Sequence, residues 1–236
     1  MTAPLPRITS DYAYRRPDPQ IDRTVAFRPV ALDRDLGRLH AWLTSDHVTP
    51  YWDLGAPLPA FHQAIGDHLE DDHVTAYVGC IDGVPMSYVE RYWVAADPLA
   101  DHYDADDNDQ GIHILIGPPE YLGQGCGTAL LRAMTALAFR HAATDRVVAE
   151  PDATNDAAIA AFERAGFEPR ETFRFPHEDK DATRVVCDRE RFVGAFSPGA
   201  IAANGPPADG PAVNHDDATH RCPSGEHGDS TPEADR

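Results

Sequence analysis

The residues with the clearest chemical potential form a glycine-rich segment, LGQGCG, between a short apolar stretch and a run of good helix formers. Gly123, Gly125 and Gly127 allow the backbone to approach an anion closely. The first amide groups of the expected helix add unpaired N–H donors at the positive end of its dipole. The segment lacks the Gly-Lys-Ser/Thr ending of a Walker loop. The spacing therefore favours a pyrophosphate-binding loop, although glycines alone are equally typical of a structural turn.

A histidine lies shortly before this segment. His113 stands in GIHILIG, which is typical of a strand, and imidazole has an ordinary pKa of about 6.5 that suits proton removal near neutral pH. A histidine in a strand is more often structural than catalytic. Asp152 follows the next expected strand and could cap the helix that begins near Thr154. These two residues are candidates for chemistry, and both also have a structural interpretation.

Aromatic and acidic residues gather in two further segments, YVERYW and HAWLTSDHVTPYW. Aromatic rings with a few carboxylates suit a flexible aliphatic amine that has a polar end. Ordinary core packing accounts for at least half of the residues in question, which are Trp42, Tyr51, Trp52, Glu90, Tyr92 and Trp93.

The elements that position these residues alternate between helical and strand periodicity. We expect helices at 32–43, 60–69 and 128–141 and a further helix that ends at Gly166. Asp82-Gly83 predicts the turn of a hairpin. Strands are expected at 24–29, 74–80, 85–94, 111–117, 146–151, 166–175 and 182–189. The fold class is therefore α+β, a single domain with a mixed sheet of about seven strands and about four helices.

The composition limits the classes of partner. The 236 residues include 39 acidic and 20 basic side chains, a net charge of −19, which argues against electrostatic binding of nucleic acid. No apolar run approaches the roughly 20 residues that a bilayer requires, and the N-terminus has no apolar signal region, so we expect a cytoplasmic protein without a membrane partner. The cations are 19 arginines and one lysine. This acidic, lysine-poor balance is typical of a halophile, whose salt shortens the Debye length to about 3 Å at 1 M.

The ends of the chain differ from its middle. Residues 1–22 are rich in proline and are expected to form an extended arm, and residues 23–194 hold the alternating pattern of the domain. Residues 195–236 have few large apolar side chains and many Pro, Gly and Asp, so they cannot bury enough surface to offset their ordering entropy. We expect an acidic, disordered tail there.

The glycine segment and the block EPDATNDAAIAAFERAGF together resemble the central motifs of the GNAT acyltransferases. In that family a strand receives the pantetheine arm of acetyl-CoA, and the loop before the next helix binds the pyrophosphate. The resemblance implies a GNAT domain that uses acetyl-CoA or another short acyl-CoA and no metal. It implies a cofactor-binding set of Ile114, Leu115, Ile116, Leu122, Gly123, Gln124, Gly125, Cys126, Gly127, Thr128, Asn155 and Phe162.

A narrower resemblance covers nearly the whole expected domain. The siderophore-biosynthesis acetyltransferases of the aerobactin type, which acylate an N-hydroxylated amine, are similar to HAWLTSDHVTPYWDLGAP, YVERYWVAADPLADHYDADDNDQGIHILIG, RVVAEPDATN and FPHEDKDATRVVCDRERF. This resemblance implies a small hydroxylamine substrate of the hydroxylysine or hydroxy-diamine type. It implies His113 as a catalytic base with Asp152 assisting it. The substrate-binding candidates are His40, Trp52, Glu90 and Trp93.

Two positions depart from the GNAT pattern. Leu122 replaces the usual Gln or Arg of the loop, and Phe162 replaces the tyrosine often proposed to protonate the thiolate. A phenyl ring cannot donate a proton, so that role falls to another group or to water. These departures keep open a non-catalytic acyl-CoA-binding module as an alternative. The other alternative is an aminoglycoside-type 6'-N-acetyltransferase, which has similar glycine and Glu-Pro blocks, although TPYWDLGAP and YVERYW argue against it.

Overall fold

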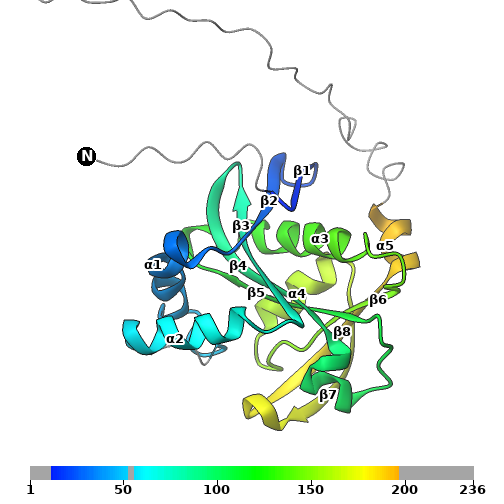
Figure 1. Ribbon diagram of the computed structural model, residues 1–236. Coiled ribbons are helices and arrows are strands. Elements are labelled where there is room, and N and C mark those ends of the chain that lie inside the picture. Colours follow the sequence, from blue (N-terminus) through cyan, green and yellow to red (C-terminus); the bar gives the residue numbers. More distant parts are fainter. Residues whose placement is uncertain (1–11, 53–55, 197–236) are drawn as a thin grey trace, which may run out of the picture.

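The computed structural model describes residues 12–52 and 56–196, which form a twisted sheet with helices on both faces (Figure 1). The strands are β1 (Tyr14–Asp18), β2 (Arg23–Pro29), β3 (Val74–Ile81), β4 (Val84–Trp93), β5 (Gln110–Ile116), β6 (Arg146–Ala149), β7 (Glu168–Phe175) and β8 (Lys180–Asp188). The helices are α1 (Leu32–Leu43), α2 (Leu58–Leu69), α3 (Cys126–Ala138), α4 (Asp156–Arg164) and α5 (Arg189–Phe196). The sheet order is β1-β2-β3-β4-β5-β6-β8-β7.

The α+β class is confirmed, and the sheet has eight strands where about seven were expected. The additional strand, β1, lies inside the expected N-terminal arm and pairs with β2. Its sequence YRRPD shows no alternation, and Pro17 is tolerated because β1 is an edge strand. The fifth helix, α5, extends two residues past the expected end of the domain. The predictions for residues 1–11 and 197–236 lie outside the described residues.

One pair of neighbouring strands in the sheet is parallel, and this pair is important for the site. β5 and β6 are parallel, and they pair only at Gln110 with Val147 and at Gly111 with Val148. Beyond this point the two strands part, and β5 continues toward Ile116 paired with β4 but not with β6. All the other neighbouring strands are antiparallel. The parting of β5 from β6 is called the fork below.

The two faces of β5 enter different cores. Ile112, Ile114 and Ile116 face the core that contains α3, whereas Leu115 faces the core formed by α1 and α2. Because side chains alternate along a strand, His113 shares the second face with Leu115. Tyr88 of β4 also belongs to the α1–α2 core, which places Glu90 on the same face as His113. Polar groups of β4 and β5 therefore meet on one side of the sheet.

Buried ion pairs attach the flanking elements to this sheet. Arg28 of β2 donates to both carboxylate oxygens of Asp35 in α1, at 2.6 and 2.7 Å. Arg132 of α3 similarly binds Asp18 at the end of β1. All four side chains are at least nine-tenths buried, so loss of either member would leave an uncompensated charge. Within the described residues, no helix combines the length and the hydropathy needed to cross a bilayer.

Candidate active site

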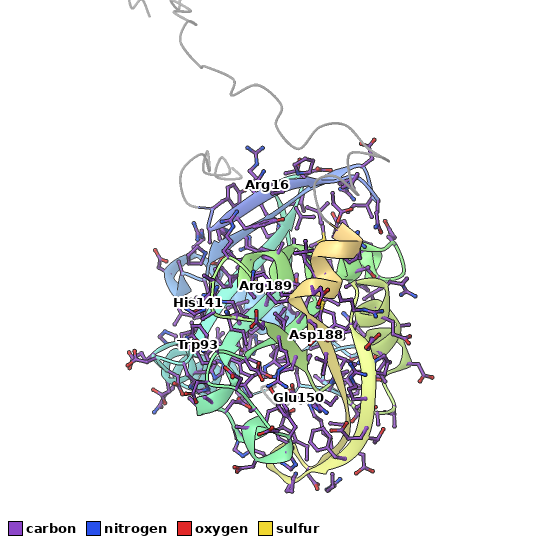
Figure 2. All side chains as sticks on the ribbon, turned by 90° about the vertical axis from the view of Figure 1, so that its right-hand side faces the viewer. Arg16, Trp93, His141, Glu150, Asp188 and Arg189 are labelled. Atoms are coloured by element: carbon purple, nitrogen blue, oxygen red, sulfur yellow. The ribbon has the colours of Figure 1, made fainter. Side chains whose placement is uncertain are left out.

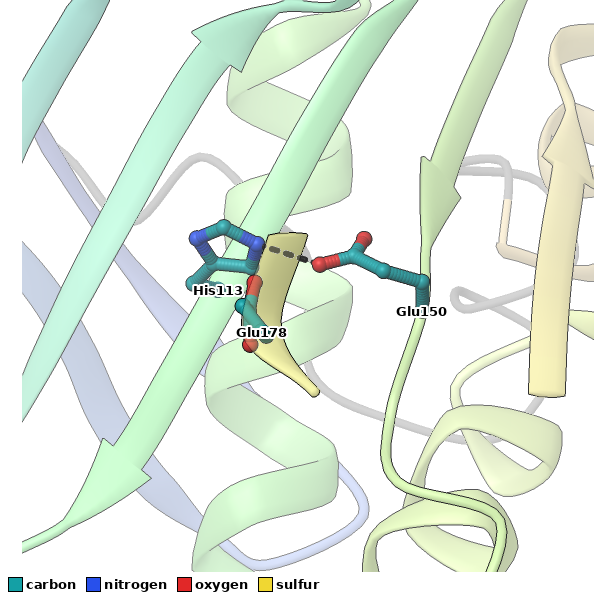
Figure 3. A group of neighbouring side chains, drawn as sticks. All are labelled: His113, Glu150 and Glu178. Carbon is teal, nitrogen blue, oxygen red and sulfur yellow. Dashed lines mark hydrogen bonds and ion pairs between the residues drawn. The ribbon is translucent and has the colours of Figure 1, made fainter. Parts of the chain in front are cut away.

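His113 lies at the centre of the candidate site, between two carboxylates. Its Nδ1 is 2.9 Å from Oε2 of Glu90, and its Nε2 is 2.6 Å from Oε1 of Glu150. Figure 3 shows the imidazole pointing across the gap between its own strand and the segment that carries Glu150. Glu90 and His113 are direct cross-strand partners in β4 and β5. The pairing of the strands therefore builds this site.

The position of Glu150 follows from the register of the parallel pair. Gly111 pairs with Val148, so His113 and Glu150 each stand two residues beyond the last paired position. Side chains two residues apart on a strand share a face. The two residues therefore occupy equivalent places on the two arms of the fork, and their side chains meet across it. This contact closes the fork on the face occupied by Glu90.

Other side chains satisfy the remaining carboxylate oxygens. Oε1 of Glu90 accepts hydrogen bonds from the Tyr88 hydroxyl and from His68 Nε2, both at 2.7 Å. The Tyr92 hydroxyl donates to Oε2 of Glu150 at 2.9 Å. Lys180 Nζ is 4.0 Å from Oε1 of Glu150. We call this group the carboxylate–imidazole network; its members are His68, Tyr88, Glu90, Tyr92, His113, Glu150 and Lys180.

A glycine fixes the orientation of Tyr92. A Cβ on Gly111 would lie 1.9 Å from the Tyr92 ring, so the ring rests directly on the bare backbone of β5. This packing directs the hydroxyl toward Glu150. Any larger residue at Gly111 would displace the ring and remove a hydrogen bond from a carboxylate whose side chain is only 2% exposed.

The charges of the network stabilise one another. Burial lowers the pKa of His113, but the carboxylates of Glu150 and Glu90 outweigh it and raise that pKa well above its ordinary value. Burial raises the pKa of Glu150, but His113, Lys180 and the Tyr92 hydroxyl bring it down to about 2. Glu90 is held ionised in the same way by His113 and His68. His113 is therefore an imidazolium at neutral pH, whereas the sequence-based prediction of a base used the ordinary pKa of about 6.5.

The glycine loop before α3 has the geometry of an anion site. Gly123 and Gly125 have φ of +70° and +78°, the left-handed region that glycine adopts without strain. Gly125 is the N-cap of α3 and supplies no side-chain cap, so the first amides of the helix remain available to a ligand. A Cβ on Gly123 would meet nothing within 4 Å. These features fit a pyrophosphate at this helix N-terminus.

The remaining cofactor-binding candidates fall into two groups. Gln124 donates its side-chain amide to the carbonyl of Glu120, and Leu122 is exposed, so both belong to the loop surface. Cys126 and Thr128 are buried in the first turn of α3. Asn155 caps α4 through a 3.0 Å bond from the amide of Ala158. Cys126, Thr128 and Asn155 therefore have a structural role in the described contacts, unlike the two residues at the loop surface.

Phe162 is buried, with its ring centroid 5.0 Å from that of Phe167. Phe162 therefore packs in the core at the position where the GNAT family often has a tyrosine, and its phenyl ring has no proton to donate. Proton donation at this site therefore requires a different group.

Asp152 uses its carboxylate locally. Its Oδ1 accepts from the amide of Thr154 at 2.7 Å and from the Thr154 hydroxyl at 2.5 Å, just before α4. The carboxylate that touches His113 belongs to Glu150, two residues earlier in the same EPD segment. Sequence reasoning selected Asp152 from this segment and missed Glu150. The signal that could have found Glu150 is the register of the two parallel strands.

Of the four substrate-binding candidates, some lie at the His113 site and others lie away from it. Glu90 is part of the network, and the Trp52 ring is 6.1 Å from the His113 ring and 5.8 Å from the Tyr88 ring. His40 instead binds the carbonyl of Ala56 at 2.9 Å. The rings of Trp93 and His141 pack with their centroids 5.0 Å apart, and both residues are labelled in Figure 2. Two of the four therefore lie at the site. His68 and Lys180, which sequence reasoning did not select, join them.

Comparison with known families and proteins gives a consistent result. The profile of the Acetyltransferase (GNAT) domain family matches residues 31–175. An N-hydroxyputrescine acetyltransferase from Acinetobacter baumannii is 34% identical over 167 residues, which are 71% of this chain and 79% of that enzyme. An N(6)-hydroxylysine O-acetyltransferase from Escherichia coli is 32% identical over 180 residues. That match covers 76% of this chain, which thus spans about half (56%) of the E. coli enzyme.

Solved structures agree on the fold. The aminoglycoside acetyltransferase AAC(6')-Ib, in complex with paromomycin and acetyl-CoA, superposes with a TM-score of 0.66 at 29% identity. The superposition covers 73% of this chain and 98% of that one. The expected fold and the expected acyl-CoA co-substrate are both confirmed by these relatives, some of which hold acetyl-CoA or coenzyme A.

Proposed function

This chain belongs to the GNAT acetyltransferase family, and from that premise we propose that it transfers an acetyl group to the nitrogen of an N-hydroxylated amine in hydroxamate siderophore assembly. The names of the two curated relatives support this substrate class. The observation that carries the proposal is the 2.6 Å contact between His113 and Glu150 across the fork. It sets a charged pair where the strand that leads to the glycine loop has an open edge.

The binding of acetyl-CoA would use the backbone. The amides that begin α3 would hold the pyrophosphate, because they lack a side-chain cap and lie at the positive end of the helix dipole. The unpaired edge of β5 beyond Gly111 offers backbone groups to the pantetheine arm. Bound acetyl-CoA supplies a thioester carbonyl as the electrophile. His113 stands on the same stretch of β5, so it would face that carbonyl.

His113 would act as a proton donor. Its side chain is 27% exposed, whereas those of Glu90 and Glu150 are 4% and 2% exposed, so the imidazolium is the member of the trio that a substrate can touch. An N-hydroxylated amine is weakly basic and is largely neutral at pH 7, so it needs little help to become a nucleophile. As the N–C bond forms and the C–S bond breaks, His113 would donate to the departing sulfur the Nδ1 proton that it otherwise gives to Glu90, because that contact of 2.9 Å is longer than the 2.6 Å contact with Glu150. The proton lost from nitrogen would then return to the ring.

This role fills the gap that Phe162 leaves. The buried carboxylates keep the ring protonated and oriented, so the donor is preorganised before the acyl donor binds. General acid–base assistance of this kind is worth about 10²-fold to 10⁴-fold in rate.

The test is the His113→Ala variant, assayed by release of free CoA with N-hydroxyputrescine and N6-hydroxylysine. We expect kcat to fall by about 10² or more while the dissociation constant of acetyl-CoA is unchanged. The wild-type pH–rate profile should lose activity on its basic limb, as His113 deprotonates, and the variant should lack that limb. A wild-type profile that falls on the acidic limb near pH 6 to 7 would instead indicate the base role. Full activity of the variant would contradict both roles.

A second candidate substrate is an aminoglycoside amine. The specific observation in its favour is coverage, because this chain matches 98% of AAC(6')-Ib but only 56% of the E. coli hydroxylysine enzyme. The same CoA-release assay with paromomycin separates the two candidates. A kcat/KM higher for paromomycin than for both N-hydroxylated amines would favour the aminoglycoside.

A further inference from the structure

The one lysine of this chain lies in the candidate site. The sequence contains 19 arginines and a single lysine, Lys180, at the start of β8. Every other long cationic side chain is therefore a guanidinium. The position of Lys180 beside Glu150 indicates that an ammonium has a function in this site that a guanidinium does not supply.

The surroundings of Lys180 show what the ammonium contacts. Its Nζ is 2.8 Å from Oε2 of Glu178 and 4.0 Å from Oε1 of Glu150, and it lies 5.6 Å from the centre of the Phe175 ring. The side chain is 14% exposed. Glu178 itself stands close to the reacting pair, since oxygen and nitrogen atoms of His113, Glu150 and Glu178 lie within 4.8 Å of one another (Figure 3). The ammonium therefore lies between an exposed carboxylate and a buried one.

We infer that Lys180 is a positioning residue, which holds the Glu150 carboxylate ionised and aligned with His113 and keeps Glu178 from competing for the imidazolium. This inference rests on the proposed function. Without Lys180, two carboxylates would face one ring nitrogen, and their repulsion would favour protonation or displacement of one of them. With Lys180, Glu178 has a partner of its own, and the 2.6 Å contact between His113 and Glu150 is undisturbed.

The geometry also explains why an arginine is absent here. A guanidinium is a planar fork that matches a single carboxylate bidentately, whereas an ammonium is a compact point charge with three donors. At this position a fork would pair with Glu178 alone and turn away from Glu150. The ammonium, stacked above Phe175, can serve both carboxylates.

The electrostatic effect must be separated from that of the other groups around Glu150. His113 of β5 and the Tyr92 hydroxyl of β4 both bind its oxygens. The charged and titratable groups that face it are Tyr92, Asp97, His113, Glu178 and Lys180. Only Lys180 and His113 among these are cations, so replacement of Lys180 leaves the carboxylate with one positive neighbour in place of two.

The experiment compares Lys180→Met, which removes the charge and keeps the length, with Lys180→Arg, which keeps the charge. Arg184→Met is the matched control, because Arg184 lies on the same strand, is 15% exposed and pairs with Glu171 outside the network. The titration of the Glu150 carboxyl is followed by ¹³C NMR and assigned with Glu150→Gln. The values of kcat and KM are measured from pH 5 to pH 8.

We expect Lys180→Met to move the Glu150 titration up by about 1 to 3 pH units, the usual effect of an opposite charge at 4 to 6 Å. Its kcat should fall increasingly below wild type as the pH drops, with KM for acetyl-CoA unchanged. Lys180→Arg keeps the charge but directs it to Glu178, so it should restore only part of the titration and only part of kcat, and Arg184→Met should behave as wild type. A merely structural lysine would lower the melting temperature without moving the Glu150 titration, and that outcome would overturn the inference.

The NMR titration also keeps this inference distinguishable from the proposed function. If the wild-type protein releases no CoA with any N-hydroxylated amine, the proposed function fails, yet the Glu150 titration still reports whether Lys180 holds that carboxylate. If the wild-type protein turns over these amines and Lys180→Met shows an unchanged titration, the inference alone fails.

Discussion

The glycine loop and the carboxylate–imidazole network are built from opposite parts of the chain. The loop uses the backbone of seven consecutive residues, 122–128, and its chemistry depends on φ angles and on free amide groups. The network uses side chains from α2, β4, β5, β8 and the segment after β6, spread over residues 68–180. The loop should therefore tolerate side-chain changes that preserve its backbone. The network should be sensitive to loss of charge, most of all at its buried carboxylates.

The glycine loop and the carboxylate–imidazole network also differ in why a substitution lowers their stability. In the loop Gly123 and Gly125 lie in the left-handed region, so a substitution at either position costs backbone strain of about 1–2 kcal/mol per residue. In the network the side chains of Glu90 and Glu150 are 4% and 2% exposed, and each charge is stable only because its partners are present. Removal of one partner leaves an uncompensated buried charge. Mutations can test this contrast.

The largest effect is expected for Gly125→Val. Valine strains a residue whose φ is +78°, and its branched side chain covers the amides that begin α3. We expect binding of acetyl-CoA to become undetectable by calorimetry.

The matched control for this change is Gly83→Val, in the turn between β3 and β4. Gly83 has φ of +79°, and a Cβ added there would meet nothing within 4 Å. The two variants should lose similar stability in urea, and only Gly125→Val should lose the cofactor. Equal acetyl-CoA affinity in both would place the pyrophosphate elsewhere.

The same contrast explains how far the sequence could predict the site. Gly123, Gly125 and the start of α3 are adjacent in the chain, so the motif itself displays their arrangement, and local periodicity also predicted the strands at the centre of the sheet. Glu150 meets His113, and Lys180 approaches Glu150, only because β5 pairs with β6 and β6 with β8. That information lies in the order of the strands. β1 was missed for a related reason, because an edge strand that contains Pro17 has no alternating pattern.

Asp152 illustrates most directly what a sequence motif cannot predict about the site. It stands in the same segment as Glu150, and a motif without register cannot tell which of the two carboxylates faces the fork. Alternation along the extended segment after Val148 places Glu150 on the face of His113. Asp152 has already turned toward Thr154 and the start of α4.

The second prediction compares Glu150→Gln with Asp152→Asn. Glu150 raises the pKa of His113, so its replacement should lower that pKa and move the basic limb of the pH–rate profile to lower pH. At pH 8 we expect kcat to fall by about tenfold or more, since each lost pH unit removes about tenfold of the protonated form.

Asp152→Asn should leave the basic limb in place, because Asp152 makes its described contacts with Thr154. Its melting temperature should fall slightly through the weakened helix start. A shift of the limb in Asp152→Asn, with none in Glu150→Gln, would restore Asp152 as the assisting acid.

The smallest effect is expected at the edge of the network, where α2 meets β4. His68 Nε2 is 2.7 Å from Glu90, and this hydrogen bond raises the pKa of His68 against the opposing effect of burial. A raised folded-state pKa means that the ion pair stabilises the fold fully below the unfolded value of about 6.5, and that this stabilisation is lost as the pH rises through the folded value. The side chain is 34% exposed, so solvent screening limits the contribution to about 1 kcal/mol or less.

His68→Gln tests this assignment, because glutamine can still donate to Glu90 but cannot carry the charge. The free energy of unfolding in urea should be lower than wild type at pH 5.5, and the difference should vanish near pH 9. His62→Gln is the control, since His62 is an exposed residue of the same helix and should show no such pH dependence. A constant difference between His68→Gln and wild type from pH 5.5 to pH 9 would mean that α2 is held to β4 by packing, and that the charged network ends at Glu90.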